Sequence, residues 1–249
     1  MKLNTDVIYY HLLQKHHLEY KKALTPEEEL GRPRYYDGSG NREGFLYLLS
    51  EPEEEPIDPG TYLCYKKPAM KDPDATTLFL LSSREDPREV YNELQNIYDY
   101  YDEWENTCLQ IVEECQDYRS LVRQTYQCFH LPVCLVDNQF SIVASGHEEN
   151  SPLALFEDDG QINLDTVNDI ISNPHMRNLE TTRGIFDFDY DRNYKLYNFR
   201  SGGKYCGRMI MGIQDAGFAD RDSLILAKLA EFIELLLHRF GSFQFTASV

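Results

Sequence analysis

The stretch DPREVYNELQNIYDYYDEWENTCLQIVEECQDYRSLV, residues 86–122, decides how the rest of the chain is organised. It opens with Asp86, Pro87 and Glu89, which supply an N-cap acceptor, a proline at the first helical position and the glutamate of a capping box. From Val90 onward, apolar or aromatic residues recur at steps of three and four, a pattern that predicts a long helix with one apolar seam. The seam consists of Leu94, Ile97, Tyr101, Trp104, Cys108, Ile111, Cys115, Tyr118 and Val122.

The segment DYYDEWE, residues 99–105, lies in the middle of this seam and holds the only tryptophan of the chain. Tyr101 and Trp104 fall on the seam, and the acidic residues fall on the flanks, so we interpret the segment as part of a packing helix rather than a binding site. Such a helix rises about 1.5 Å per residue and exceeds the span of one small domain. We therefore expect the seam to pair with the same helix of a second copy, as a homodimer seam.

The part before the helix, residues 1–85, predicts a small domain that contains both helix and strands. Apolar spacing indicates a helix over residues 5–24, and short apolar runs indicate strands at 44–49, 61–65 and 77–81. The connections between these strands are rich in proline and acidic residues, which is typical of solvated loops. For the first connection, EPEEEPIDPG at residues 51–60, an acidic docking site is the alternative interpretation.

The part after the helix, residues 129–249, predicts an antiparallel sheet with flanking helices. Residues 132–145 have the pattern of a strand, a tight turn and a second strand. A helical insert follows, with Leu164, Val167 and Ile171 on one face. Three further strands and a closing helix complete the pattern, at residues 184–190, 194–200, 204–213 and 220–240. We predict an α+β protein with a small amino-terminal domain (1–85), a long connecting and dimerisation helix (86–128) and a carboxy-terminal sensor-like domain (129–249).

Composition excludes several classes of protein. The formal net charge is −18 at pH 7, and this negative field would repel the phosphates of nucleic acids. The amino terminus lacks the pattern of a signal peptide, and no apolar run approaches the length of a membrane span, so we expect a cytoplasmic protein without membrane contact. The six cysteines form no CxxC pair and are expected to be reduced and buried. A redox pair of Cys108 and Cys115, seven residues apart, is the alternative.

Two segments resemble a known family. The stretch KYCGRMIMGIQDAGFADRDSLILAKLAEFIELLL, residues 204–237, resembles the closing part of GAF domains, through Gly207, Phe218 and Asp222. The stretch EVYNELQNIYDYYDEWE, followed by PVCLVDNQFSIVAS, is similar to the amino-terminal sensory regions of PucR/CdaR-type bacterial transcription regulators. The resemblance covers roughly residues 75–245 and implies a GAF/PAS-like sheet that responds to a small metabolite. In that family DNA is bound by a carboxy-terminal helix-turn-helix, and the residues after Phe240 are too few to form one.

The resemblance implies that a ligand lies between the sheet and the helical insert, among apolar walls with a few polar groups. The candidate ligand-binding residues are His147, Arg183, Tyr190 and Tyr197. Tyr190 and Tyr197 share the strand alternation of Phe186, Phe188 and Phe199. If the ligand is an organic acid, Arg183 is expected to pair with it; a purine-derived metabolite is the other class that the family suggests. The alternative is that these residues bind no ligand and are ordinary core or surface residues.

No motif of catalysis or metal binding stands out. The run from Asp187 to Asp191 begins like a calcium loop but lacks the later glycine and glutamate. His11, His16 and His17 have no acid or cysteine at ligand spacing, so they are expected on a helix surface. We predict no metal, no cofactor and no catalytic residue. Two alternatives remain: a structural dimerisation module without ligand, and an enzyme that uses Cys134 or Cys206 with His130, His147 or His175.

Overall fold

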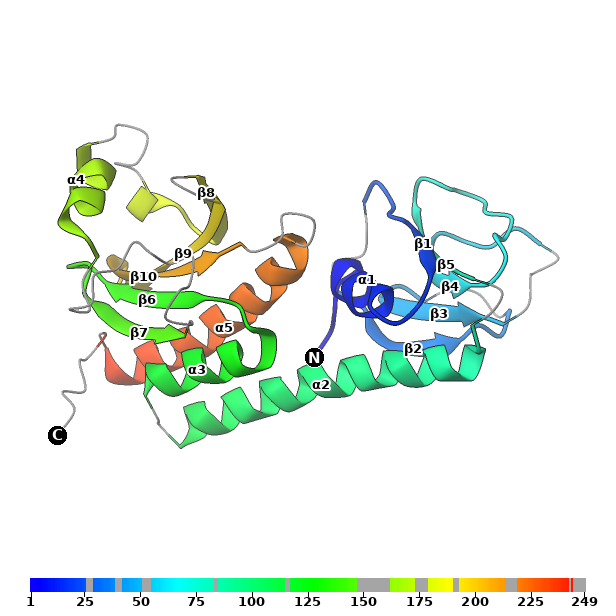
Figure 1. The fold of residues 1–249 in the computed structure, drawn as a ribbon, viewed down its shortest axis with the longest axis horizontal. Helices are drawn as coiled ribbons and strands as arrows, with labels where there is room; N and C mark the ends of the chain where they lie inside the picture. Colours follow the sequence, from blue (N-terminus) through cyan, green and yellow to red (C-terminus); the bar gives the residue numbers. More distant parts are fainter. Residues whose placement is uncertain are drawn as a thin grey trace. The chain divides into compact units, whose positions relative to one another are not determined.

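The structure, a computed structural model, describes residues 1–25, 29–38, 42–50, 55–82, 85–114, 117–146, 162–172, 179–189, 193–213, 219–241 and 243. The chain has an α+β fold (Figure 1) and divides into two compact units, Met1–Glu103 (unit 1) and Trp104–Val249 (unit 2). The boundary falls inside helix α2 (Pro87–Glu113), which contributes residues to both units. The predicted separate domain over 86–128 is therefore wrong, because each part of the helix packs into the core of its own unit.

Unit 1 contains a five-stranded sheet of order β1-β5-β4-β3-β2. Neighbouring strands from β2 to β5 are parallel, whereas β1 pairs antiparallel with β5. The strands are β1 (Leu18–Lys21), β2 (Gly31–Tyr35), β3 (Phe45–Leu49), β4 (Gly60–Cys64) and β5 (Thr76–Leu81). The three predicted strands are confirmed as β3, β4 and β5. The helix predicted over 5–24 is too long, because α1 (Thr5–Leu13) ends early and residues 18–21 pair with β5.

Both faces of the unit 1 sheet are covered. On one face, Tyr47, Tyr62 and Leu78 pack with Ile57 and Met70, which belong to the loops between the strands. On the other face, Phe79 stacks on Tyr20, which stacks on Tyr9 of α1. The first part of α2 also packs in unit 1, where the Tyr98 hydroxyl donates to the carbonyl of Leu30 at 3.2 Å and Tyr101 lies 3.1 Å from His11 Nε2. The two-sided burial explains why the central strands β3, β4 and β5 are apolar almost throughout.

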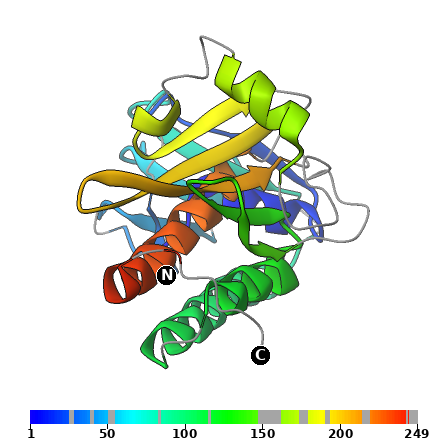
Figure 2. The same ribbon diagram turned by 90° about the vertical axis from the view of Figure 1, so that its left-hand side faces the viewer.

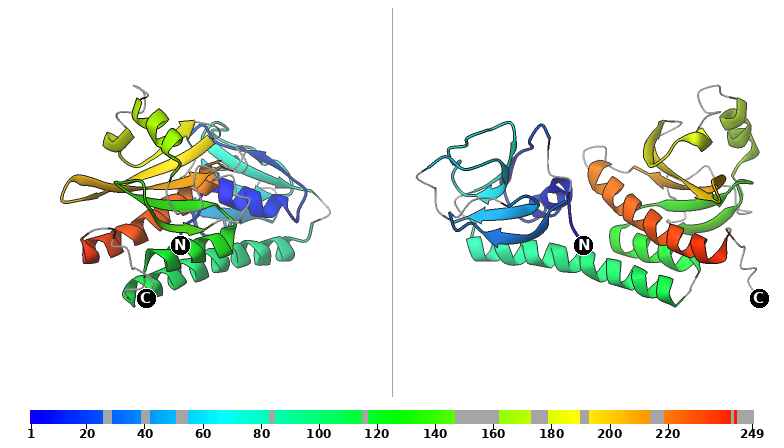
Figure 3. Two further views of the ribbon diagram at one scale, coloured as in Figure 1. Left: turned by 60° about the vertical axis from the view of Figure 1, so that its left-hand side comes forward. Right: turned by 180° about the vertical axis from the view of Figure 1, so that it is seen from behind.

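Unit 2 contains an antiparallel sheet, as the sequence predicted, and its strand order is β7-β6-β10-β9-β8. The strands are β6 (Val133–Asp137), β7 (Ile142–Gly146), β8 (Ile185–Asp189), β9 (Asn193–Ser201) and β10 (Lys204–Gly212). Helix α4 (Leu164–Ser172) lies on one side of this sheet, and α3 (Tyr118–Phe129) and α5 (Ala219–Phe240) lie on the other (Figure 2). The view from behind in Figure 3 shows α3 and α5 side by side along the sheet.

The helix predicted over 86–128 is interrupted. α2 ends at Glu113, and α3 begins at Tyr118 after Asp117, whose carboxylate accepts the backbone N–H of Ser120 at 2.9 Å. An N-cap of this kind satisfies amide groups that the first turn of a new helix leaves without partners. The periodic seam runs on across the break, which is why the sequence pattern did not reveal it.

The predicted homodimer seam is buried within the chain itself. Leu94, Ile97 and Tyr101 are at most 3 % exposed in unit 1. In unit 2, Trp104 packs edge-on against Phe129 of α3 and Phe232 of α5. The other described members, Cys108, Ile111, Tyr118 and Val122, are also buried, and Cys115 lies outside the described residues. The seam is therefore not a surface for a second copy, because the two units of one chain already cover it.

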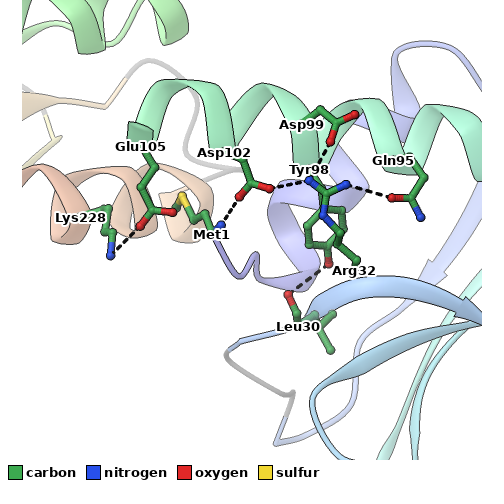
Figure 4. A network of polar contacts seen from close by, with 9 residues as sticks. All are labelled: Met1, Leu30, Arg32, Gln95, Tyr98, Asp99, Asp102, Glu105 and Lys228. Atoms are coloured by element: carbon green, nitrogen blue, oxygen red, sulfur yellow. Dashed lines mark hydrogen bonds and ion pairs between the residues drawn. The ribbon is translucent and has the colours of Figure 1, made fainter. Parts of the chain in front are cut away.

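The acidic flank of α2 is paired with basic groups (Figure 4). Arg32 of β2 reaches Asp99 at 2.7 Å, Asp102 at 2.5 Å and the side-chain oxygen of Gln95 at 3.1 Å. The amino group of Met1 also donates to Asp102. In unit 2, Glu105 pairs with Lys228 of α5 at 2.9 Å. Tyr101 and Trp104 of DYYDEWE thus belong to the cores, in keeping with a packing helix. Asp99, Asp102 and Glu105 form ion pairs.

Candidate functional site

The predicted ligand residues do not form one site among the described residues. His147 and Tyr190 lie outside the described part of the chain. Arg183 is exposed, between the short 3-10 helix η1 (Leu179–Thr181) and β8. An exposed arginine is poorly placed to recognise a buried acid, because water competes for its donors.

Tyr197 lies on the opposite face of the sheet from the residues with which it was grouped. Phe186 and Phe188 pair in register with Leu196 and Tyr194, and all four belong to the apolar cluster on the α4 side. Tyr197 alternates with these residues and points the other way, where its hydroxyl donates to Glu234 of α5 at 2.7 Å. Burial, and next this hydrogen bond, raise the pKa of Tyr197 above its ordinary value. The prediction that Tyr197 shares the face of Phe188 is wrong, since the tyrosine connects β9 to α5.

Arg208 is a buried polar residue that does lie on the α4 side. It pairs in register with Val136 of β6 and Asn198 of β9, so it shares the face of the apolar cluster Cys134, Val136, Leu196 and Ile210. The residue is only 5 % exposed, and its Nε donates to the Asn198 side-chain oxygen at 2.7 Å. Its Nη2 is buried and has no hydrogen-bond partner within the described parts of the chain.

Asn198 and Arg200 attach this face to the segment around η1. The Asn198 amide donates to the carbonyl of Thr182 at 3.0 Å and to that of Leu179. Arg200 donates to the carbonyl of Glu180 and, at 3.2 Å, to that of Gly203. Three carbonyl groups of one short segment, those of Leu179, Glu180 and Thr182, are thus held by two side chains of β9.

Arg208 forms no ion pair with a carboxylate among the described residues, although Glu180 is close enough to influence its charge. Burial lowers the pKa of its guanidinium from the ordinary value, and Tyr205 and Glu180 act in the opposite direction. Arg208 also lies over the ring of Tyr205, with 5.7 Å between its Cζ and the ring centroid. A buried cation held by one neutral amide and one ring is costly unless an anion joins it.

Sequence reasoning missed this group, although a signal for it was present. In the strand over 204–213, Arg208 occupies the same alternation as Ile210, and in β9 Asn198 occupies the same alternation as Leu196. Two polar residues on an apolar strand face indicate a buried polar pair. The pairing of β10 with β9, which brings the two together, needs the fold.

The described residues offer little for metal or thiol chemistry. No group of three or more His, Cys, Asp or Glu in the described ranges is arranged to hold a metal ion. Asp187 is exposed and pairs with Lys195 at 2.8 Å, and His16 lies in the α1–β1 connection with its Nδ1 2.8 Å from Glu85. Burial raises the pKa of Cys206 to about 11, and burial likewise raises that of Cys134. Such thiols remain protonated at neutral pH.

Two hollows lie in unit 1. One, of about 360 Å³, is lined by residues that include Leu13, His16 and Leu80; the other, of about 340 Å³, lies beside Gly60 and Thr77. Neither includes any predicted ligand residue. Across the described part of the chain, no helix has the length and apolar character needed to cross a membrane.

In comparisons with known proteins, no protein-family model and no curated protein matches the sequence. The resemblance to PucR/CdaR-type sensory regions therefore stays an expectation from the residues themselves.

Proposed function

We propose that this chain is a cytoplasmic ligand-sensing region of a PucR/CdaR-like transcription regulator, in which a small metabolite binds unit 2 on the α4 side of its sheet. DNA would be bound by an output domain outside this chain, since the charge of −18 disfavours nucleic-acid contact. The observation that carries the proposal is the buried Arg208, whose Nη2 has no partner among the described residues. A polar group of this kind among apolar walls is a feature of ligand sites.

The route from ligand to output would pass through β9. Asn198 on one face of this strand holds the η1 segment, and the next residue back, Tyr197, holds Glu234 of α5 on the other face. A ligand that prefers one arrangement of the η1 segment would shift β9 and with it the packing of α5 against α3 and α2. Trp104, at the centre of these three helices, is the natural reporter of such a shift.

The proposal includes a homodimer. The seam that motivated it is buried inside one chain, so a dimer would have to use another surface. A structural module without ligand is the second candidate, favoured by the close packing of the apolar cluster around Phe188, Tyr194 and Leu196.

The test is a titration of the whole chain with organic acids and purine-derived metabolites, in which the fluorescence emission of Trp104 is measured. Because the chain has a single tryptophan, the variant W104F supplies the blank for signals that do not come from Trp104. The proposal expects a saturable change with at least one compound. If no compound changes either the emission or the melting temperature, the structural module is the better description.

A further inference from the structure

The larger of the two hollows in unit 1, of about 360 Å³, lies at the end of the parallel part of the sheet. Its walls come from the last turn of α1, the α1–β1 connection, β1 and the carboxyl end of β5, where Leu81 pairs in register with Leu18. Leu13 and Leu80 complete the apolar part of the lining. Open sheets with parallel strands typically bind ligands outside the carboxyl ends of those strands, and the volume lies within the range of small-molecule sites.

His16 supplies this hollow with a polar group that has an unused nitrogen. The side chain lines the hollow, is 10 % exposed, and has its Nδ1 2.8 Å from Oε2 of Glu85. The other carboxylate oxygen of Glu85 accepts the backbone N–H of His17 at 3.3 Å, so this carboxylate is held in place. When Nδ1 carries the proton that Glu85 accepts, a neutral imidazole presents Nε2 as an acceptor. In the described part of the chain, Nε2 has no hydrogen-bond partner.

The charges at the hollow favour a cationic ligand over an anionic one. Glu19 belongs to the lining, which contains no lysine or arginine among the described residues. Lys15, in the α1–β1 connection, pairs with Glu93 of α2 at 2.7 Å. An anion would therefore meet the charge of Glu19 without a cation to balance it, whereas an ammonium group would find acceptors in Glu19 and His16.

We propose that this hollow of unit 1 binds a small primary amine with an apolar body. The ammonium group donates to Nε2 of His16 and lies near the carboxylate of Glu19, and the apolar body contacts the leucines of the lining. Glu85 is a positioning residue, because it holds the imidazole without belonging to the lining. The site is separate from the one proposed in unit 2 and does not depend on the sensory function.

The experiment measures binding of defined probes to the whole chain by calorimetry. The probes are butylamine, hexylamine and phenethylamine, the carboxylates of matching length, the trimethylammonium analogues of the same amines, and zinc chloride. We expect at least one primary amine to bind. Its carboxylate and its trimethylammonium analogue should bind at least about tenfold more weakly, because the first has the wrong charge and the second has no N–H to donate.

Three variants locate the amine. H16N keeps an amide N–H that can reach Glu85 but has no atom in place of Nε2, so it should weaken the amine at least about tenfold. E19Q should weaken it by about two- to fivefold, because Glu19 is exposed and water screens its charge. H130N is the control and should leave the affinity unchanged. His130 is the left-handed C-cap of α3 in unit 2, a conformation that asparagine adopts readily.

If H16N does not fold, the ring-proton resonances of the wild-type chain replace it: the amine must shift those of His16 and leave those of His130 in place. Equal affinity of wild type and H16N, equal affinity for amines and carboxylates, no binding of any amine, or binding of zinc alone at His16 would overturn the inference. Each of these outcomes would leave the sensory function standing, because the titration followed by Trp104 emission tests unit 2 separately.

Discussion

At the scale of single residues, the structure depends on a few positions where no other side chain fits the geometry. Gly207 of β10 is one of them: a methyl group at its Cα would overlap the carbonyl oxygen of Val136 and approach the ring of Phe243. Asp102 matters for a different reason, because it accepts from Arg32 and from the amino group of Met1 while it is partly buried on α2. Each position leads to a prediction.

Replacing Gly207 by alanine should destabilise unit 2 by about 1 to 3 kcal/mol, the usual cost of overfilling a packed site. The strands β6 and β10 would have to separate, because the atom in the way belongs to the backbone of Val136. Urea denaturation followed by Trp104 emission measures the change. The exposed S145A in the same sheet is the control and should stay within about 0.5 kcal/mol. An unchanged midpoint for G207A would mean that β6 and β10 approach less closely.

We expect the ion pairs of Asp102 to make the free energy of unfolding decrease at acidic pH. Burial acts to raise the pKa of this carboxyl, but hydrogen bonds from the Met1 amino group and Arg32 outweigh it, so the folded pKa lies below the ordinary 3.8. When the folded-state pKa of a carboxyl is lower than its unfolded-state pKa, its stabilisation is fully present at pH values above the unfolded-state pKa. This stabilisation is lost as the pH falls through the folded-state pKa.

D102N should therefore cost about 1 to 2 kcal/mol at pH 7 and much less at pH 2. Thermal unfolding followed by circular dichroism at both pH values tests this difference. D99N is the matched control, with a smaller effect, because the Asp99 side chain is 63 % exposed against 27 % for Asp102. Equal losses at both pH values would show that the charge of Asp102 has no part in stability.

At the scale of elements, the sequence predicted most strands and the existence of the helices, but not all of their ends. The alternation of Phe186 and Phe188 with Asp187 located β8 and its apolar face correctly. β1 and β2 were missed because each is short: Leu18–Lys21 continues the apolar spacing of α1, and Gly31–Tyr35 contains Pro33 and two arginines. Such segments become strands through pairing with β5 and β3, which local propensity does not encode.

The interruption between α2 and α3 depends on the N-cap at Asp117. D117A should destabilise unit 2 by about 0.5 to 2 kcal/mol, because the N–H of Ser120 loses its acceptor. Urea denaturation read from Trp104 emission is suitable, since Phe129 of α3 packs against this tryptophan. D117N can still accept the hydrogen bond and should recover most of the loss. If D117A is as stable as wild type, the break between the helices has another cause.

At the scale of the whole molecule, the largest error of sequence reasoning concerned the apolar seam. Its length suggested a second copy, yet two units of the same chain bury Leu94, Tyr101, Trp104 and Cys108. An apolar seam predicts that a helix is covered on one side, but it does not predict which segment covers it. Here the covering segments come from distant parts of the same sequence. The candidate site was missed for the same reason, because Arg208 and Asn198 meet only when β10 pairs with β9.

The proposed coupling through β9 predicts a specific variant. Y197F removes the hydroxyl that donates to Glu234 at 2.7 Å, so it should leave ligand affinity within about twofold of wild type but reduce the ligand-dependent change of Trp104 emission by at least about half. E234Q keeps an acceptor for the tyrosine and should retain the response. A full response in Y197F would mean that the signal reaches the helices by another route.

The central claim is that a ligand on one face of the unit 2 sheet changes the helices on the other, and amide hydrogen exchange with and without a bound metabolite tests it most directly. We predict protection at Leu179–Thr181, β9 and β10, together with altered exchange in α3 and α5 at the same ligand occupancy. Changes restricted to the α4 side, with α3 and α5 exchanging as in the free protein, would contradict the claim.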